Sequence, residues 1–153
     1  MEIFVFGSNL AGIHGAGSAK HARNHFGAEL GVGKGRTGNA YAIPTKSARF
    51  NVLPLKEIAG YVSEFIDYAI ANPDLTFTVV KVGCGLTGYS EDQISPMFSV
   101  APKNCNLPDG WRKESFNSLD LHLHLGEIKN NEEYKKWQQA LGEGRYIPRK
   151  RLQ

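Results

Sequence analysis

The residues of this chain that could do chemistry lie in two glycine-rich segments, each directly after a short apolar run. The first spans residues 7–18 and reads Gly-Ser-Asn-Leu-Ala-Gly-Ile-His-Gly-Ala-Gly-Ser; the second spans residues 82–89 and reads Val-Gly-Cys-Gly-Leu-Thr-Gly-Tyr. Glycine lets a ligand approach the backbone because no Cβ is in the way. A strand, a glycine-rich loop and a helix in this order also direct unpaired N–H groups and a positive helix dipole at one place. The first segment therefore favours binding of phosphate or another anion.

We expect the two segments to lie together in space. Ligands of open α/β sheets bind in the crevice outside the carboxyl ends of the strands. Two loops from different strands at that edge can hold one extended ligand, such as a diphosphate. The predicted ligand-binding residues are Gly7, Ser8, Asn9, Leu10, Ala11, Gly12, His14, Gly15, Ala16, Gly17, Gly83, Cys84, Gly85, Leu86, Thr87, Gly88 and Tyr89.

Side chains in or beside these segments supply candidates for catalysis. His14 could contact a phosphate or steer a water, although its position equally suits a surface histidine. Asp92 could place a water, but acidic residues in a first helical turn also occur for electrostatic reasons alone. Cys84 has no histidine nearby in sequence, which favours a small packing residue over a nucleophile. His21 and His25 share a helix face without an acidic or thiol partner, so we predict no metal site and no cofactor.

A third glycine-rich stretch is predicted to have a different role. Residues 33–38 match G-x-G-x-x-G literally, but a strand and not a helix is predicted to follow them, so the dinucleotide-binding context is missing. A phosphate-binding P-loop is also excluded, because Gly35 and not Ser or Thr follows Lys34. We expect residues 31–38 to form a mobile loop that could fold over a ligand.

Strands and helices are predicted to alternate around these segments. Apolar or β-branched runs predict strands at residues 2–6, 39–43, 75–82 and 119–125. Three- and four-residue apolar spacing predicts helices at residues 18–26, from Pro54 to Asn72, and at residues 130–141. The β-α-β-α-β order predicts an α/β fold with a mainly parallel sheet covered by helices.

Residues with special roles at helix and strand ends predict where these elements stop. Ser18 is the expected N-cap of the first helix and Gly27 its C-terminal stop. Pro44 is expected to close the strand at residues 39–43. Ser90 and Gln93 resemble a capping box, while Ser95-Pro96 offers an alternative start for the same helix.

Composition limits the class of protein. The chain has 153 residues, 41% hydrophobic and 22% charged, which indicates one globular domain. No apolar run reaches the roughly 20 residues of a membrane helix, and Glu2 in a short apolar start argues against a secretory signal. Cys84 and Cys105 form no zinc or disulfide pattern, so we interpret them as reduced thiols of a cytoplasmic protein.

The charge distribution bears on nucleic-acid binding. The net charge is +3, and the basic residues at the end of the chain, within residues 145–153, account for the excess: Arg145, Arg149, Lys150 and Arg151. The rest is near neutral, which argues against a broad basic face for nucleic acid. We interpret the tail as a solvated terminus; a nucleic-acid module that uses it is the alternative.

Three stretches together resemble the macrodomain superfamily. They are residues 7–22 (Gly-Ser-Asn-Leu-Ala-Gly-Ile-His-Gly-Ala-Gly-Ser-Ala-Lys-His-Ala), 38–45 (Gly-Asn-Ala-Tyr-Ala-Ile-Pro-Thr) and 82–89 (Val-Gly-Cys-Gly-Leu-Thr-Gly-Tyr). They are most similar to a macrodomain-like branch of bacterial and phage proteins. The resemblance covers roughly residues 1–111 and leaves residues 112–153 as a C-terminal extension packed on or beside that core.

The resemblance implies a three-layer α/β/α fold, with a mixed, mainly parallel sheet, that binds ADP-ribose or a related nucleotide diphosphate. It implies that Asn9 contacts the distal ribose, that residues 12–17 follow that ribose and the diphosphate, and that residues 83–89 form a second phosphate loop. One hypothesis is hydrolysis of an ADP-ribose derivative, with Asn9, His14 and Asp92 as the catalytic residues: Asn9 orients the distal ribose, and His14 or Asp92 assists the attacking water. The alternative is a non-catalytic binder that sequesters a nucleotide signal, as a phage could use against a host.

Overall fold

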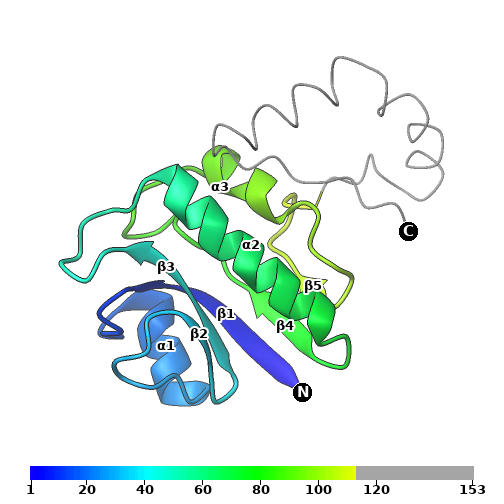
Figure 1. Cartoon of the computed structure of the whole chain (residues 1–153), viewed down its shortest axis with the longest axis horizontal. Helices are drawn as coiled ribbons and strands as arrows, with labels where there is room; N and C mark the ends of the chain where they lie inside the picture. Colours follow the sequence, from blue (N-terminus) through cyan, green and yellow to red (C-terminus); the bar gives the residue numbers. More distant parts are fainter. Residues whose placement is uncertain (113–153) are drawn as a thin grey trace.

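A five-stranded mixed sheet forms the centre of the molecule (Figure 1). The computed structural model of the chain describes residues 1–112. In sheet order the strands are β2 (Gly35–Thr37), β3 (Ala40–Lys46), β1 (Glu2–Asn9), β4 (Thr76–Val79) and β5 (Cys105–Asn106). Neighbouring strands run parallel except β2, which is antiparallel to β3. The predicted α/β class and the mixed, mainly parallel sheet are confirmed.

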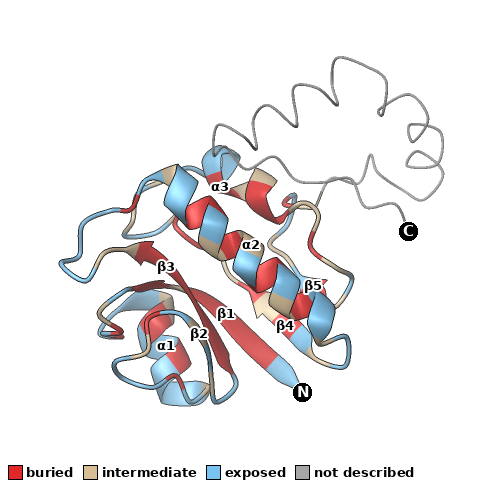
Figure 2. Cartoon of the chain, viewed as in Figure 1, coloured by how far each residue is buried: buried red, intermediate tan, exposed pale blue. Residues whose placement is uncertain are grey.

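The middle of the sheet is apolar on both faces, and this determines where the helices pack. Ile3 and Val5 of β1 belong to the larger core cluster, with the buried side chains of α2 (Leu55–Ala71) and α3 (Glu91–Phe98). The alternate residues Phe4 and Phe6 face the second cluster, with alanines of α1 (Gly17–His25). Because successive side chains of a strand point to opposite faces, helices cover both faces of the sheet (Figure 2).

Two strands run further than their sequence predicts, and a third is shorter. β1 continues through Gly7 and Ser8 to Asn9, so the first three residues of the glycine-rich segment still pair with β3. The prediction that Pro44 closes β3 is wrong. β2 pairs only with residues 40–42, so the missing N–H of Pro44 costs no interstrand bond on that side. β4 covers only residues 76–79 of the predicted 75–82.

The first helix begins earlier than predicted. Its N-cap is Ala16, not Ser18, and no side chain in the described part of the chain caps it. Its predicted stop is confirmed, because Gly27 follows the C-cap Phe26 with a φ of 77°. α2 runs from Leu55 to Ala71, with Pro54 as N-cap and Asn72 as C-cap, so the helix predicted from Pro54 to Asn72 is confirmed to within one residue at each end.

Two further predictions concern the start of the third helix and residues 31–38. α3 starts at Glu91 behind a complete capping box of Ser90 and Gln93, so the alternative start at Ser95-Pro96 is wrong. Pro96 lies inside α3 and removes one backbone donor from it. The mobile loop expected at residues 31–38 is wrong in part, because Gly35–Thr37 forms the edge strand β2.

The described chain ends in a well-anchored segment. Trp111 is 2% exposed, and the Arg112 guanidinium donates to the carbonyls of Ala101, Pro102 and Cys105 at 2.6–3.2 Å. The expected strand at residues 119–125, the helix at 130–141, the extension packed beside the core and the basic tail at 145–153 lie outside the described residues. No helix within residues 1–112 is long and apolar enough to cross a membrane.

Close packing of backbone on backbone requires glycine at Gly12, Gly33 and Gly38, where a Cβ would lie 2.7 Å or less from a backbone atom of another segment. A Cβ on Gly12, whose φ is 70°, would lie 2.3 Å from the carbonyl carbon of Gly31, and one on Gly33 would lie 2.2 Å from the Asn9 oxygen. We expect Gly12→Ala and Gly33→Ala each to lower the free energy of unfolding by about 2 kcal/mol or more. Urea denaturation followed by circular dichroism measures this.

Gly60 provides the matched control. It lies in the middle of α2 with nothing within 4 Å of a built Cβ, so Gly60→Ala should raise the free energy of unfolding by about 0.5–1 kcal/mol. Equal effects of the three substitutions would contradict this account of the close approach.

Candidate functional site

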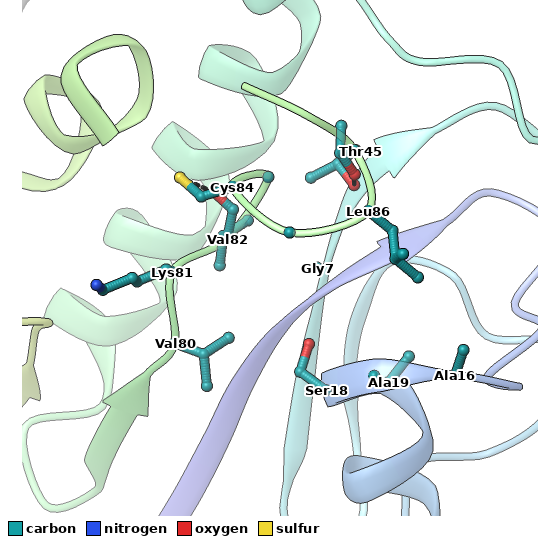
Figure 3. Close-up of a pocket in the computed structure, with 14 residues that line it drawn as sticks. Gly7, Ala16, Ser18, Ala19, Thr45, Val80, Lys81, Val82, Cys84 and Leu86 are labelled. Atoms are coloured by element: carbon teal, nitrogen blue, oxygen red, sulfur yellow. Dashed lines mark hydrogen bonds between the residues drawn. The ribbon is translucent and has the colours of Figure 1, made fainter. Parts of the chain in front are cut away.

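A cavity of about 400 Å³ opens at the edge of the sheet where β1, β3 and β4 end. It is lined by Gly7 of β1, residues 16–19 at the start of α1, Thr45 of β3 and residues 80–87 after β4. In Figure 3 the loop formed by residues 83–87 arches over Gly7, and Ser18 and Ala19 lie opposite it. The structure thus brings parts of both glycine-rich segments to one cavity.

Small residues allow the two segments to meet. A Cβ on Gly7 would lie 3.6 Å from the Gly83 nitrogen and 3.6 Å from Thr45 Cγ2, in ordinary van der Waals contact, so β1, the end of β3 and the second loop meet at the floor of the cavity. Gly83 has a φ of 76°, and its built Cβ would lie 3.2 Å from Ile94 Cδ1. Gly85 is different, because it has no positive φ and nothing lies within 4 Å of its built Cβ. Neither backbone conformation nor packing requires glycine at position 85, which leaves open space beside the cavity.

Hydrogen bonds hold the loop of residues 83–89 over the cavity. The Tyr89 N–H donates to the Gly83 carbonyl at 3.0 Å and closes the loop at its base. The hydroxyls of Thr45 and Thr87 are 2.9 Å apart, which joins the loop to the end of β3. The Tyr89 hydroxyl donates to the Leu53 carbonyl at 2.7 Å. Tyr89 therefore anchors the loop and does not line the cavity.

The first turn of α1 faces the cavity with unused backbone donors. The first hydrogen bond of this helix runs from the Lys20 N–H to the Ala16 carbonyl at 3.2 Å. The N–H groups of Gly17, Ser18 and Ala19 therefore have no acceptor within the helix. Among residues 1–112 no side chain caps this end, and no acidic residue lies in the first turn. Partial positive charge is therefore concentrated at the cavity wall, where an anion would be stabilised.

The predicted catalytic side chains lie elsewhere. Asn9 is 9% exposed, and its side-chain amide forms two hydrogen bonds with the backbone of Ile13, at 2.8 and 3.1 Å. His14 is 1% exposed, packs edge-on against Phe6 and donates from Nε2 to the Glu29 carbonyl at 3.1 Å; its Nδ1 has no partner in the described chain. Neither residue lines the cavity.

The other residues that the sequence predicts for the site also lie outside the cavity. The Ser8 hydroxyl donates to the Gly33 carbonyl, and Gly12 packs against Gly31. Asp92 is exposed in the first turn of α3. Leu10, Ala11, Gly15 and Gly88 are likewise absent from the wall.

Two ionisable side chains line the cavity among the described residues, Lys81 and Cys84. Lys81 Nζ donates to Glu91 Oε2 at 3.3 Å, and Trp111 Nε1 donates to Glu91 Oε1 at 2.9 Å. These hydrogen bonds, the Trp111 bond foremost, hold the pKa of the Glu91 carboxyl below its usual 4.5. Burial raises the pKa of the Cys84 thiol above 9.0; Glu91 raises it further and Lys81 opposes it.

Sequence reasoning missed several residues of the wall: Ser18, Ala19, Thr45, Val80, Lys81 and Val82. Thr45 follows the apolar run of β3 directly, so the rule that ligands lie outside the carboxyl ends of strands could have found it. Lys81 falls inside the strand predicted at residues 75–82, whereas β4 ends at Val79.

The arrangement can bind an anion of extended shape. It offers backbone donors of α1 and glycines of a second loop on facing walls, hydroxyls of Ser18, Thr45 and Thr87, and the cation Lys81 beside the opening. Comparisons with family models, with curated proteins and with solved structures give no match to this chain.

The Glu91 carboxylate should titrate at lower pH than an ordinary glutamate. A lowered folded-state pKa means that its stabilising effect is complete well above pH 4.5 and is lost as the pH falls through the folded value. We expect the indole Nε1–H resonance of Trp111 to shift with a midpoint below 4.5. Two-dimensional NMR of a Trp137→Phe variant, which keeps Trp111 as the one indole, measures it. A midpoint at or above 4.5 would contradict the Glu91–Trp111 bond.

Cys84 should be a slow nucleophile at neutral pH. Because burial raises its pKa, we expect the rate of its alkylation by iodoacetamide to rise with a midpoint above pH 9. Peptide mass spectrometry follows residue 84 separately from residue 105. Glu91→Gln should lower the midpoint and Lys81→Met should raise it, since the two charges act in opposite directions. A midpoint near 7 would show an activated thiolate instead.

Proposed function

We propose that this protein is a macrodomain-like binder of ADP-ribose or a related nucleotide diphosphate, held in the cavity between α1 and the loop of residues 83–87. The observation that carries the proposal is that the uncapped N-terminus of α1 and the second glycine-rich loop face the same cavity. Backbone donors of α1 on one side and the glycine-rich loop on the other suit an extended anion such as a diphosphate. A cavity of about 400 Å³ is within the range of small-molecule sites.

Further features of the chain support the macrodomain-like assignment. The sheet is mixed and mainly parallel, and helices cover both of its faces. The three stretches of sequence that resemble macrodomains, residues 7–22, 38–45 and 82–89, each contribute residues to the cavity. A shared ligand explains why stretches so far apart in the chain carry small residues at the same edge.

The chemistry of the wall favours binding without turnover. A hydrolase needs a group that accepts a proton from water at the reacting atom. Lys81 and the high-pKa thiol of Cys84 are the ionisable side chains of the described wall, and neither suits that task at neutral pH. Asn9 and His14 are engaged with backbone atoms outside the cavity. We therefore favour a protein that sequesters the nucleotide over one that hydrolyses it.

An acidic residue placed at the helix end tests the proposal. Ser18→Asp puts a carboxylate in the first turn of α1, where it interacts favourably with the helix dipole and repels a bound anion. We expect the variant to be at least as stable as the wild type and to bind ADP-ribose at least tenfold more weakly. Isothermal titration calorimetry measures the affinity, and thermal unfolding measures the stability.

Asn24→Asp is the matched control, because it makes the same charge change on α1 at the end away from the cavity. It should leave the affinity within about twofold of the wild type, since the charge is far from the anion. Chromatography of the bound nucleotide after prolonged incubation should return it intact. Absence of heat with ADP-ribose for the wild type would refute the proposed ligand, and its release as cleaved products would refute binding without turnover.

A further inference from the structure

Two histidines of α1 lie side by side on the surface of the molecule. His21 and His25 are four residues apart in the helix, which places them on one face in successive turns. Their ring centroids are 4.7 Å apart, and the ring planes are inclined to each other by 45°. Both residues are exposed, and within residues 1–112 no hydrogen bond or ion pair engages either ring. The ring nitrogens are therefore available to a ligand from solution.

The separation of the two rings is the one that imidazoles need to share a metal ion. At a zinc–nitrogen distance of about 2.0–2.1 Å and an angle of about 90–110° at the ion, the two ring centroids lie about 4.5–5.2 Å apart. The observed 4.7 Å falls within this range. The same i, i+4 spacing on a helix supplies both histidine ligands in the H-E-x-x-H class of zinc sites.

Aromatic packing holds the His21 ring in place. Phe4 of β1 packs against it edge-on, with ring centroids 5.2 Å apart, and Phe26 packs against it at 5.7 Å. Phe4 and Phe26 stack on each other at 4.8 Å, so the two phenyl rings support each other beneath the histidine. A side chain that the fold already holds loses less conformational entropy when it binds a ligand.

The local charge both favours a cation and limits its affinity. His25 lies in the last turn of α1, where the negative end of the helix dipole stabilises positive charge. Lys20 and Arg23, the other charged side chains of α1, oppose it. No group of three or more histidine, cysteine, aspartate or glutamate residues within residues 1–112 could hold a metal ion, so water completes the coordination of an ion bound to the histidine pair. Such a site binds reversibly and more weakly than a structural site with four protein ligands.

We infer that His21 and His25 form a surface site for one divalent transition-metal ion of the kind that imidazole ligands suit, such as Zn²⁺. The site is separate from the candidate nucleotide site, because neither histidine lines the cavity. The ion joins two successive turns of α1, so it stabilises the helix whose first turn forms a wall of the cavity. The sequence predicts no metal site, because no acidic or thiol partner accompanies the two histidines; the convergence of their rings is the observation that carries the inference.

Titration of the full chain with ZnCl₂ tests the site. The reference protein carries His122→Gln and His124→Gln, so that the two histidines outside the described residues do not contribute. It should bind one Zn²⁺ per chain, and its thermal midpoint should rise by about 2 °C or more at saturation. His21→Gln or His25→Gln, added to the reference, should each lower the affinity at least tenfold. Isothermal titration calorimetry and thermal unfolding measure these changes.

An exchange of two residues of α1 is the matched control. Arg23→His combined with His25→Arg keeps the composition and charge of the helix, but it places the two histidines two residues apart, where side chains do not face each other. The exchanged protein should keep the circular dichroism of the reference, bind Zn²⁺ as weakly as His21→Gln and show no rise in thermal midpoint. Reference-like affinity in the exchanged protein or in His21→Gln would overturn the inference, and so would a reference protein that binds no Zn²⁺.

Discussion

The parallel pairing of β1 with β3 on one side and with β4 on the other is the constraint on which the candidate site depends. Parallel neighbours end at the same edge of a sheet, so the segments that follow these three strands emerge together. Gly7, Thr45 and Val80 come from, or directly follow, the three strands, and all three line the cavity. The pairing in turn depends on burial of β1 on both faces, because Ile3 and Val5 pack under α2 while Phe4 and Phe6 pack under α1.

The glycines of the chain divide into two physical groups. Gly12, Gly33 and Gly38 are required by the fold, because a Cβ at any of them would lie 2.7 Å or less from a backbone atom of another segment. At Gly83 the φ of 76° favours glycine. Gly85 meets nothing, and the same is true of Gly17, whose positive φ alone favours glycine. The first group explains how distant loops approach one another closely. The second group leaves free volume at the cavity, which is what a ligand held by backbone donors requires.

The N-termini of α1 and α3 differ in a way that bears on function. α3 has a complete capping box and two acidic residues in its first turn, which satisfy its backbone donors and its dipole. α1 has neither. A missing N-cap costs a helix about 1 kcal/mol, and the same chain provides a full cap elsewhere. The uncapped N-terminus of α1 lies at the cavity. An anion bound there would offset the stability that the missing cap costs.

The sequence by itself determined the α/β class, the two glycine-rich segments, most helix and strand positions and the capping box at Ser90, because apolar periodicity and end residues are local signals. Only the tertiary structure decided which of those residues face the cavity. Asn9 and His14 read as site residues, but backbone partners at Ile13 and Glu29 hold them elsewhere. Which atoms meet across a sheet depends on strand order and register, and neither is encoded in a short stretch of chain.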